Sequence, residues 1–184
     1  MTDEQFNAAM HRMRKKEKSA LKEIYEEYLS FIYHTVLNIV GNKETAEDIT
    51  SEFFIKLWEK ADNYKEGHGH RGYLATIARN MAIDHIRKYS KEDLMSTASD
   101  EDDGPDELEV LSDPGGSPED TVIEELSVEE ALSRLKPVYR EIITMKVLSD
   151  MTFKEIAEVL KLPMGTVTWN YQQAIKLLRR FGYE

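Results

Sequence analysis

The sequence predicts an all-α protein with two small helical domains joined by an acidic flexible linker, the C-terminal one a helix-turn-helix. Apolar residues recur at spacings of three and four in both halves of the chain, which is the period of an amphipathic helix. Residues 90–116 lack this pattern. They are acidic, poor in aromatic residues and interrupted by Gly and Pro, so they cannot bury enough apolar surface to offset chain entropy. We expect the two domains at residues 1–89 and 117–184.

Composition limits the compartment and the chemistry. The 184 residues include no cysteine, which excludes a disulfide or a thiolate metal site and is compatible with a reducing compartment. The first 18 residues have no apolar run behind their charges, so a secretory signal is not expected. No stretch approaches the roughly 20 apolar residues of a membrane span. We therefore expect a cytoplasmic protein without a membrane partner.

The net charge of −11 is unevenly distributed along the chain. Residues 1–89 hold 14 basic and 14 acidic side chains, residues 90–131 hold 1 and 16, and residues 132–184 hold 9 and 5. Because the acidity is central, the flanking domains remain compatible with nucleic acid. The central block is either a solubilising tether or a polyanion that occupies a basic channel in a partner.

The most informative stretch is residues 71–88, which the pattern predicts to be one amphipathic helix. Its buried stripe is expected to contain Leu74, Ile77, Ala78, Met81 and His85. The opposite face mixes an aromatic ring, hydroxyl and amide groups and a cation, on Tyr73, Thr76, Asn80, Ile83 and Arg87. This mixture suits unstacked bases on a phosphate chain. An ordinary core helix with a varied exterior explains it equally well.

Three stretches precede this helix. Residues 1–18 end in a basic cluster, which we expect to be a frayed, solvated helix start. Residues 21–40 predict a long helix with a broad apolar face, closed by Gly41-Asn42. A third helix from about Thr45 should bury Ala46, Ile49, Phe53 and Leu57. Its opposite face carries acidic residues around an exposed Ile55, and is either a docking surface for a basic partner or a plain solvated face.

Residues 62–69, DNYKEGHG, are polar and glycine-bearing, and they predict a loop that leads into the 71–88 helix. A loop beside a base-reading face is where one extruded base could be held. His68 and His70 do not predict a metal site, because no cysteine or carboxylate cluster completes a ligand set. We expect no cofactor. The sequence shows no paired carboxylates, no nucleophile with a base and no phosphate-binding glycine loop. We therefore expect neither an enzyme nor a small-molecule substrate.

The C-terminal domain should begin at Ser117, an N-cap followed by Pro118. A further helix begins at Pro137 and should bury Ile142, Ile143, Met145 and Leu148. Residues 152–180 then predict two short helices with a tight turn at Lys161-Leu162-Pro163, which resemble a helix-turn-helix. A helical hairpin within a bundle can look similar.

The outward positions of the second of these helices are polar or aromatic. They are Thr166, Trp169, Gln172, Gln173 and Lys176. Gln can bond two atoms of an adenine edge, while Lys176, Arg179 and Arg180 can meet phosphates. Trp169 either presses on thymine methyl groups or packs on a neighbouring helix.

The order of these parts resembles a bacterial RNA polymerase sigma factor of the extracytoplasmic-function type. IARN followed by IDHIR, at residues 77–87, is similar to the second conserved region of that family. EIAE followed by GTV, at residues 155–167, is similar to its fourth region. The resemblance covers roughly residues 20–89 and 117–180.

The resemblance implies a transcription initiation factor that binds core RNA polymerase and directs it to promoter DNA, with an anti-sigma protein as a further expected partner. It implies that the polymerase is docked by Asp48, Glu52, Ile55 and Lys56. It implies that the −10 element is melted and captured by Asn63, His70, Arg71, Tyr73, Thr76, Arg79, Asn80, Arg87 and Lys88. The −35 duplex would be read by Thr166, Thr168, Trp169, Gln172, Gln173, Lys176, Arg179 and Arg180. The acidic linker would lie in the RNA exit path.

Two departures from the family pattern leave the promoter sequence open. The family often has Trp where this chain has Tyr73, and an aromatic residue where it has His70. Lys or Arg usually follows GTV, where this chain has Thr168, Trp169 and Asn170. The alternatives are a stand-alone helix-turn-helix regulator, and an interaction protein that binds polymerase or an inhibitor without starting transcription. The 71–88 helix separates these readings, since a stand-alone regulator has no use for its polar face.

Overall fold

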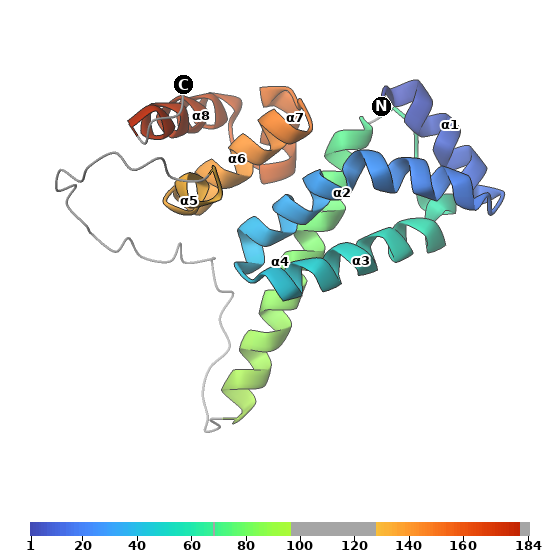
Figure 1. The fold of residues 1–184 in the computed structure, drawn as a ribbon, viewed down its shortest axis with the longest axis horizontal. Helices are drawn as coiled ribbons and strands as arrows, with labels where there is room; N and C mark the ends of the chain where they lie inside the picture. Colours follow the sequence, from blue (N-terminus) through green and yellow to red (C-terminus); the bar gives the residue numbers. More distant parts are fainter. Residues whose placement is uncertain (68, 97–127, 181–184) are drawn as a thin grey trace.

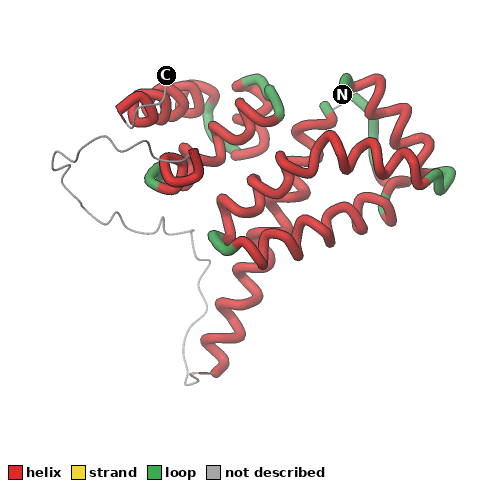
Figure 2. The backbone as a smooth tube through the Cα atoms, in the orientation of Figure 1, coloured by secondary structure: helices red, strands yellow, loops and turns green. Residues whose placement is uncertain are grey.

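The computed structural model describes residues 1–67, 69–96 and 128–180, and every regular element in these ranges is a helix (Figures 1 and 2). The helices are α1 (Asp3–Arg14), α2 (Lys18–Val40), α3 (Lys43–Glu59), the short 3-10 helix η1 (Ala61–Asn63), α4 (His70–Ser96), α5 (Val128–Ser133), α6 (Pro137–Leu148), α7 (Phe153–Leu160) and α8 (Met164–Arg180). The all-α prediction is confirmed. The stretch expected as a linker beyond Ser96 and the expected helix start at Ser117 lie outside the described residues.

Helices α2, α3 and α4 pack against one another and form the larger part of the core. The stripe predicted for α3 is buried, from Ala46 through Ile49 and Phe53 to Leu57. Gly41 ends α2 with φ of 69°, in the left-handed region that glycine enters without the steric cost of a Cβ. Asn42 then caps α3 by accepting a hydrogen bond from the Thr45 backbone.

Helix α1 corrects the sequence analysis, which expected a frayed, solvated start. Thr2 and Gln5 form a capping box in which each side chain bonds the backbone N–H of the other residue. The apolar side of α1 is buried in the core and consists of Phe6, Ala9, Met10 and Met13. Spacings of three and four place these residues on one face, so α1 is a packed part of the fold.

Helix α4 continues past residue 89 to Ser96 and so enters the stretch that the sequence analysis expected to be linker. Its fully buried residues are small, apart from Leu74, and they are Ala75, Ala78 and Ala82. Small side chains allow neighbouring helices to approach α4 closely. This helix contacts α2 and α3 and also α7.

The C-terminal helices form the predicted helix-turn-helix. Thr152 and Glu155 make a capping box at the start of α7, and Lys161 ends that helix in the left-handed region with φ of 55°. One expectation is wrong: Leu148 is 45 % exposed, because α6 ends there and Met151, just beyond, fills the core position instead. The Met151 backbone N–H bonds the Met145 carbonyl and so turns the chain inward.

The two halves of the protein are in contact, with α6 against α2 and α7 against α4 (Figure 1). The side chains of Ile142, Met145 and Ile156 belong to the same buried cluster as those of α1 to α4. Asn38 donates a hydrogen bond of 2.8 Å to Thr144 across this contact. The sequence does not predict the packing, because the apolar stripes of α6 and α7 are equally consistent with a core inside the C-terminal domain alone.

Candidate nucleic-acid interface

The exposed face of α4 carries the polar groups that the sequence predicted there. Thr76, Asn80, Arg87 and Lys88 are exposed. Thr76 also donates a hydrogen bond of 2.8 Å from its hydroxyl to the Gly72 carbonyl, so its oxygen remains free to accept. The helix therefore presents amide, hydroxyl and cationic groups together to the outside.

Tyr73 lies at the edge of this face and is half-buried. Its ring meets the ring of Tyr64 edge-on, with 5.0 Å between the centroids. Burial raises the pKa of Tyr73, so its hydroxyl keeps its proton at neutral pH. Tyr64 is a buried residue of the loop between η1 and α4, so the position of this loop bears on that of the Tyr73 ring.

His70 does not fit its predicted role in capturing the −10 element, because it is only 2 % exposed. The ring stacks on Phe6, with 4.8 Å between the centroids, and bonds Asp3 and Tyr28. Burial lowers the pKa of His70, so the ring is neutral at pH 7. Since a carboxylate can only accept, we assign Nδ1–H as the donor to Asp3 and Nε2 as the acceptor from the Tyr28 hydroxyl.

The loop from Tyr64 to Gly69 leads into α4, and Asn63 just before it is exposed. Gly67 and Gly69 have φ of 95° and 71°, which favours glycine at both positions. His68 lies outside the described residues. Among the residues that are described, no group of three or more His, Asp or Glu side chains is arranged to hold a metal ion.

Two predicted −10 residues are partly covered. Arg71 is half-buried, and Arg79 is turned toward the C-terminal half, where its Nε donates a 2.9 Å hydrogen bond to Glu141 of α6. The Arg79 side chain is 27 % exposed and that of Glu141 is 11 % exposed. Arg79 is thus engaged in a partly buried ion pair between the two halves.

The α3 face predicted to dock a partner is exposed at Asp48, Glu52 and Ile55, and Ile55 is 57 % exposed. Lys56 pairs with Glu52 one turn away, at 2.7 Å. An exposed apolar side chain among carboxylates is suited to a partner that is basic around an apolar spot.

Next to this face, a groove of about 510 Å³ opens between α2 and α3, which the sequence analysis did not predict. Its lining includes Tyr25, Tyr33 and Thr50. The Thr50 hydroxyl is buried and has no hydrogen-bond partner among the described residues. Tyr25 lies in the stretch for which the sequence predicted a broad apolar face, but it is 41 % exposed. The sequence feature that could have indicated this groove is the pair Tyr25 and Tyr33, eight residues apart on α2.

On α8 most of the predicted reading residues project outward. The exposed ones are Thr166, Trp169, Gln172, Lys176, Arg179 and Arg180. Thr168 and Gln173 are half-buried, and the Thr168 hydroxyl donates to the Met164 carbonyl of its own helix. Trp169 is 56 % exposed, so more than half of its surface remains available to a partner. Val167 and Ala174 are buried and hold the opposite side of α8 on the fold.

None of the helices in the described ranges has both the length and the apolar character needed to traverse a bilayer.

Comparisons with known proteins agree with this geometry. Residues 24–92 match the family model of sigma-70 region 2, and residues 125–178 match that of sigma-70 region 4. The chain is 29 % identical over 171 residues to the ECF RNA polymerase sigma factor SigW of Bacillus subtilis, with 91 % of each chain covered. It is 31 % identical over 168 residues to the ECF sigma factor BldN of Streptomyces coelicolor, covering 89 % of this chain and 61 % of that one.

Two solved structures share the fold. One is the sigma factor RpoE in complex with the anti-sigma factor NepR from Bartonella quintana, with a TM-score of 0.59, 21 % identity, and coverage of 87 % of this chain and 96 % of that chain. The other is CnrH in complex with the cytosolic domain of CnrY, with a TM-score of 0.60, 15 % identity, and coverage of 96 % of both chains. With both family models matched in one chain, the protein belongs to the ECF-type RNA polymerase sigma factors, with a sigma-70 region 2 domain and a region 4 domain.

Proposed function

We infer that the protein acts as a non-catalytic initiation factor that directs RNA polymerase to promoters, with region 2 at the −10 element and region 4 at the −35 element. The observation that carries this function is the pairing, in one chain, of a polar α4 face with an exposed α8 face. The first suits unstacked bases and the second suits a duplex groove. A stand-alone regulator would need only the second.

For the −10 element, we propose that Asn63, Arg71, Tyr73, Thr76, Asn80, Arg87 and Lys88 contact the melted strand. The Tyr73 ring offers a stacking surface, Asn80 offers amide hydrogen bonds, and Arg87 with Lys88 meets phosphates. Arg79 joins this set only when it leaves Glu141. His70 is omitted because it is buried.

For the −35 element, we propose that α8 enters the major groove with Thr166, Trp169, Gln172 and Gln173 toward base edges. Lys176, Arg179 and Arg180, toward the C-terminal end of α8, would meet the phosphate backbone. Thr168 would offer its methyl group and its hydroxyl oxygen as an acceptor, since its hydroxyl proton is donated within the helix.

For polymerase binding, we propose the α3 face of Asp48, Glu52, Ile55 and Lys56. Glu52→Arg should weaken co-purification with core enzyme by about tenfold, since a reversed charge opposes a basic partner. Glu26→Arg is the matched control, because Glu26 also pairs with a lysine one turn away, Lys22, on the exposed surface of α2. Equal losses for both variants would remove the α3 face from the proposal.

RpoE and CnrH were each solved with an anti-sigma partner. We propose that an anti-sigma protein also holds this chain. We further propose that the acidic stretch between the domains, within residues 90–131 that hold 16 acidic side chains and 1 basic one, lies against basic walls of the RNA exit path.

Run-off transcription with purified core polymerase and a genomic promoter pool tests the function directly. The expected result is a restricted set of transcripts that depends on the added protein. A stand-alone regulator would bind duplex DNA without core enzyme and add no transcripts, and that outcome would overturn the proposal.

A further inference from the structure

Helix α1 precedes residues 24–92, which match region 2, and it lies against the connection between α3 and α4 (Figure 1). Four of its side chains face that connection: Asp3, Asn7, His11 and Arg14. Their spacing of three or four residues places them on one side of the helix. We call these four residues the α1 clamp, and the described residues of the connection, 61–67, 69 and 70, the capture loop.

The clamp holds the first part of the capture loop by three hydrogen bonds. The Arg14 guanidinium donates to the Ala61 carbonyl at 3.2 Å and to the Tyr64 carbonyl at 2.6 Å. The Tyr64 hydroxyl donates to the Asn7 side chain at 2.7 Å. Both Arg14 bonds are partly buried and charge-assisted, which makes them stronger than neutral ones.

The clamp also holds the far end of the loop. Asp3 accepts from the His70 backbone N–H at 3.2 Å and from the His70 ring. Between the two ends, the His11 ring lies 2.7 Å from the Glu66 carboxylate. The loop is thus attached to α1 at its start, middle and end.

These attachments bear on base capture because the capture loop contains Gly67 and Gly69, which lose much conformational freedom when they are ordered. A loop that is already ordered pays less of this entropy when it closes on a ligand, and the fraction of molecules competent to bind is higher. Tyr73 rests on Tyr64, so the loop also sets the position of a proposed stacking ring.

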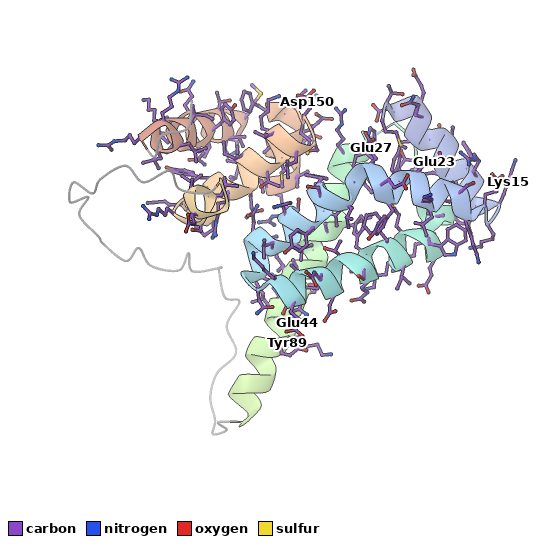
Figure 3. All side chains as sticks on the ribbon, viewed as in Figure 1. Lys15, Glu23, Glu27, Glu44, Tyr89 and Asp150 are labelled. Atoms are coloured by element: carbon purple, nitrogen blue, oxygen red, sulfur yellow. The ribbon has the colours of Figure 1, made fainter. Side chains whose placement is uncertain are left out.

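We propose that the α1 clamp positions the capture loop for the extruded −10 base, with Asp3, Asn7 and Arg14 as positioning residues that do not touch DNA. This inference rests on the proposed −10 role of α4. It also gives a role to two residues of the basic cluster of α1. Arg14 donates to loop carbonyls and Arg12 donates to Glu17 and Glu23, so neither guanidinium is free to bind phosphate. Glu23, labelled in Figure 3, lies on α2.

The central test compares Arg14→Ala with Arg12→Ala, two truncations of the same side chain on the same helix. Hydrogen exchange in the full-length free protein should accelerate in peptides covering residues 61–70 for Arg14→Ala only. In holoenzyme with a promoter found by run-off transcription, Arg14→Ala should slow strand opening by about tenfold or more, because two charge-assisted hydrogen bonds that order the loop are lost. Duplex binding before opening should remain at the wild-type level for both variants.

Two milder substitutions keep the test decisive if Arg14→Ala does not fold. Asn7→Ala and Tyr64→Phe each remove one end of a single hydrogen bond and keep the Tyr64 ring in the core. If that bond positions the loop, each variant slows opening by a few-fold, and the double variant is no slower than either single one. Arg14→Lys should recover part of the opening rate, since an ammonium reaches carbonyls without the guanidinium fork.

The inference is overturned if Arg14→Ala loosens the loop yet opens promoters at the wild-type rate. It is equally overturned if Arg12→Ala slows opening as much as Arg14→Ala. If the wild-type holoenzyme opens no promoter, the proposed function itself fails, which is a different result.

Discussion

The two DNA-facing helices are built in different ways. On α8 the proposed reading residues project from one helix, and their exposure follows from helical periodicity around Val167 and Ala174. On α4 the corresponding surface depends on other elements, since Tyr73 rests on Tyr64 and Arg79 pairs with Glu141. The −35 surface is therefore a local property of a helix, whereas the −10 surface is a tertiary assembly. Substitutions far from DNA should affect the second and spare the first.

The largest expected effect is on stability. Phe6→Ala should lower the free energy of unfolding by about 3–5 kcal/mol, because the ring is fully buried and packs on His70, Tyr64 and Tyr28. Urea denaturation of the full chain measures this. Met164→Ala on α8, where the side chain is 57 % exposed, should change stability by less than about 0.5 kcal/mol. A small cost for Phe6→Ala would mean that α1 does not organise the −10 surface.

The next effect concerns the contact between the halves. In a double-mutant cycle, Arg79→Ala and Glu141→Ala should show a coupling energy of about 1–2 kcal/mol, because both charged side chains are partly buried. The exposed Lys22–Glu26 pair on α2 serves as reference and should couple by about 0.5 kcal/mol or less. Equal coupling in the two pairs would show that the halves are not held together by Arg79 in solution.

On α8 the expected effect is on binding and not on folding. Lys176→Ala should reduce the salt dependence of −35 duplex binding by the holoenzyme by about one unit of slope, as for the loss of one phosphate contact. Thermal unfolding should be unchanged, since Lys176 is exposed. Lys22→Ala on α2 is the control and should leave the slope at its wild-type value.

The smallest expected effect is a loss of stability on acidification. Burial lowers the pKa of His70 from its ordinary 6.5, and hydrogen bonds from His70 lower the pKa of Asp3 from its ordinary 3.8. Asp3, Tyr28 and Arg71 face the His70 ring.

For both groups the unfolded chain binds the proton more readily, so their contribution to stability is lost as the pH falls. For His70 the loss begins as the pH falls through 6.5, and the part due to Asp3 follows below 3.8. Unfolding free energies measured from pH 7 downward should show this decline. His70→Gln should remove the part of the decline that begins at about pH 6.5. An unaltered pH profile in that variant would contradict the assignment of this part to His70.

The sequence analysis succeeded where one helix determines the outcome. The α3 stripe and the outward residues of α8 follow from periodicity alone, and both were predicted. It failed where distant elements decide. His70 was assigned to DNA, but its burial depends on Phe6 and Asp3, which lie on a helix expected to be frayed.

The error over α1 has a physical reason. Its buried face is marked by one phenylalanine, with Ala9, Met10 and Met13, and the basic cluster from Arg12 to Lys18 that follows it dominated the interpretation. The contact between the halves was also missed, because a partly buried pair such as Arg79–Glu141 leaves no pattern in the sequence.

Permanganate reactivity of promoter thymines in the holoenzyme tests most directly whether α4 opens the −10 element. With wild-type protein, thymines of the −10 region should become reactive. With Tyr73→Ala combined with Asn80→Ala, we predict that this reactivity is lost while binding to core polymerase stays intact. Reactivity at the wild-type level in the double variant would contradict the account.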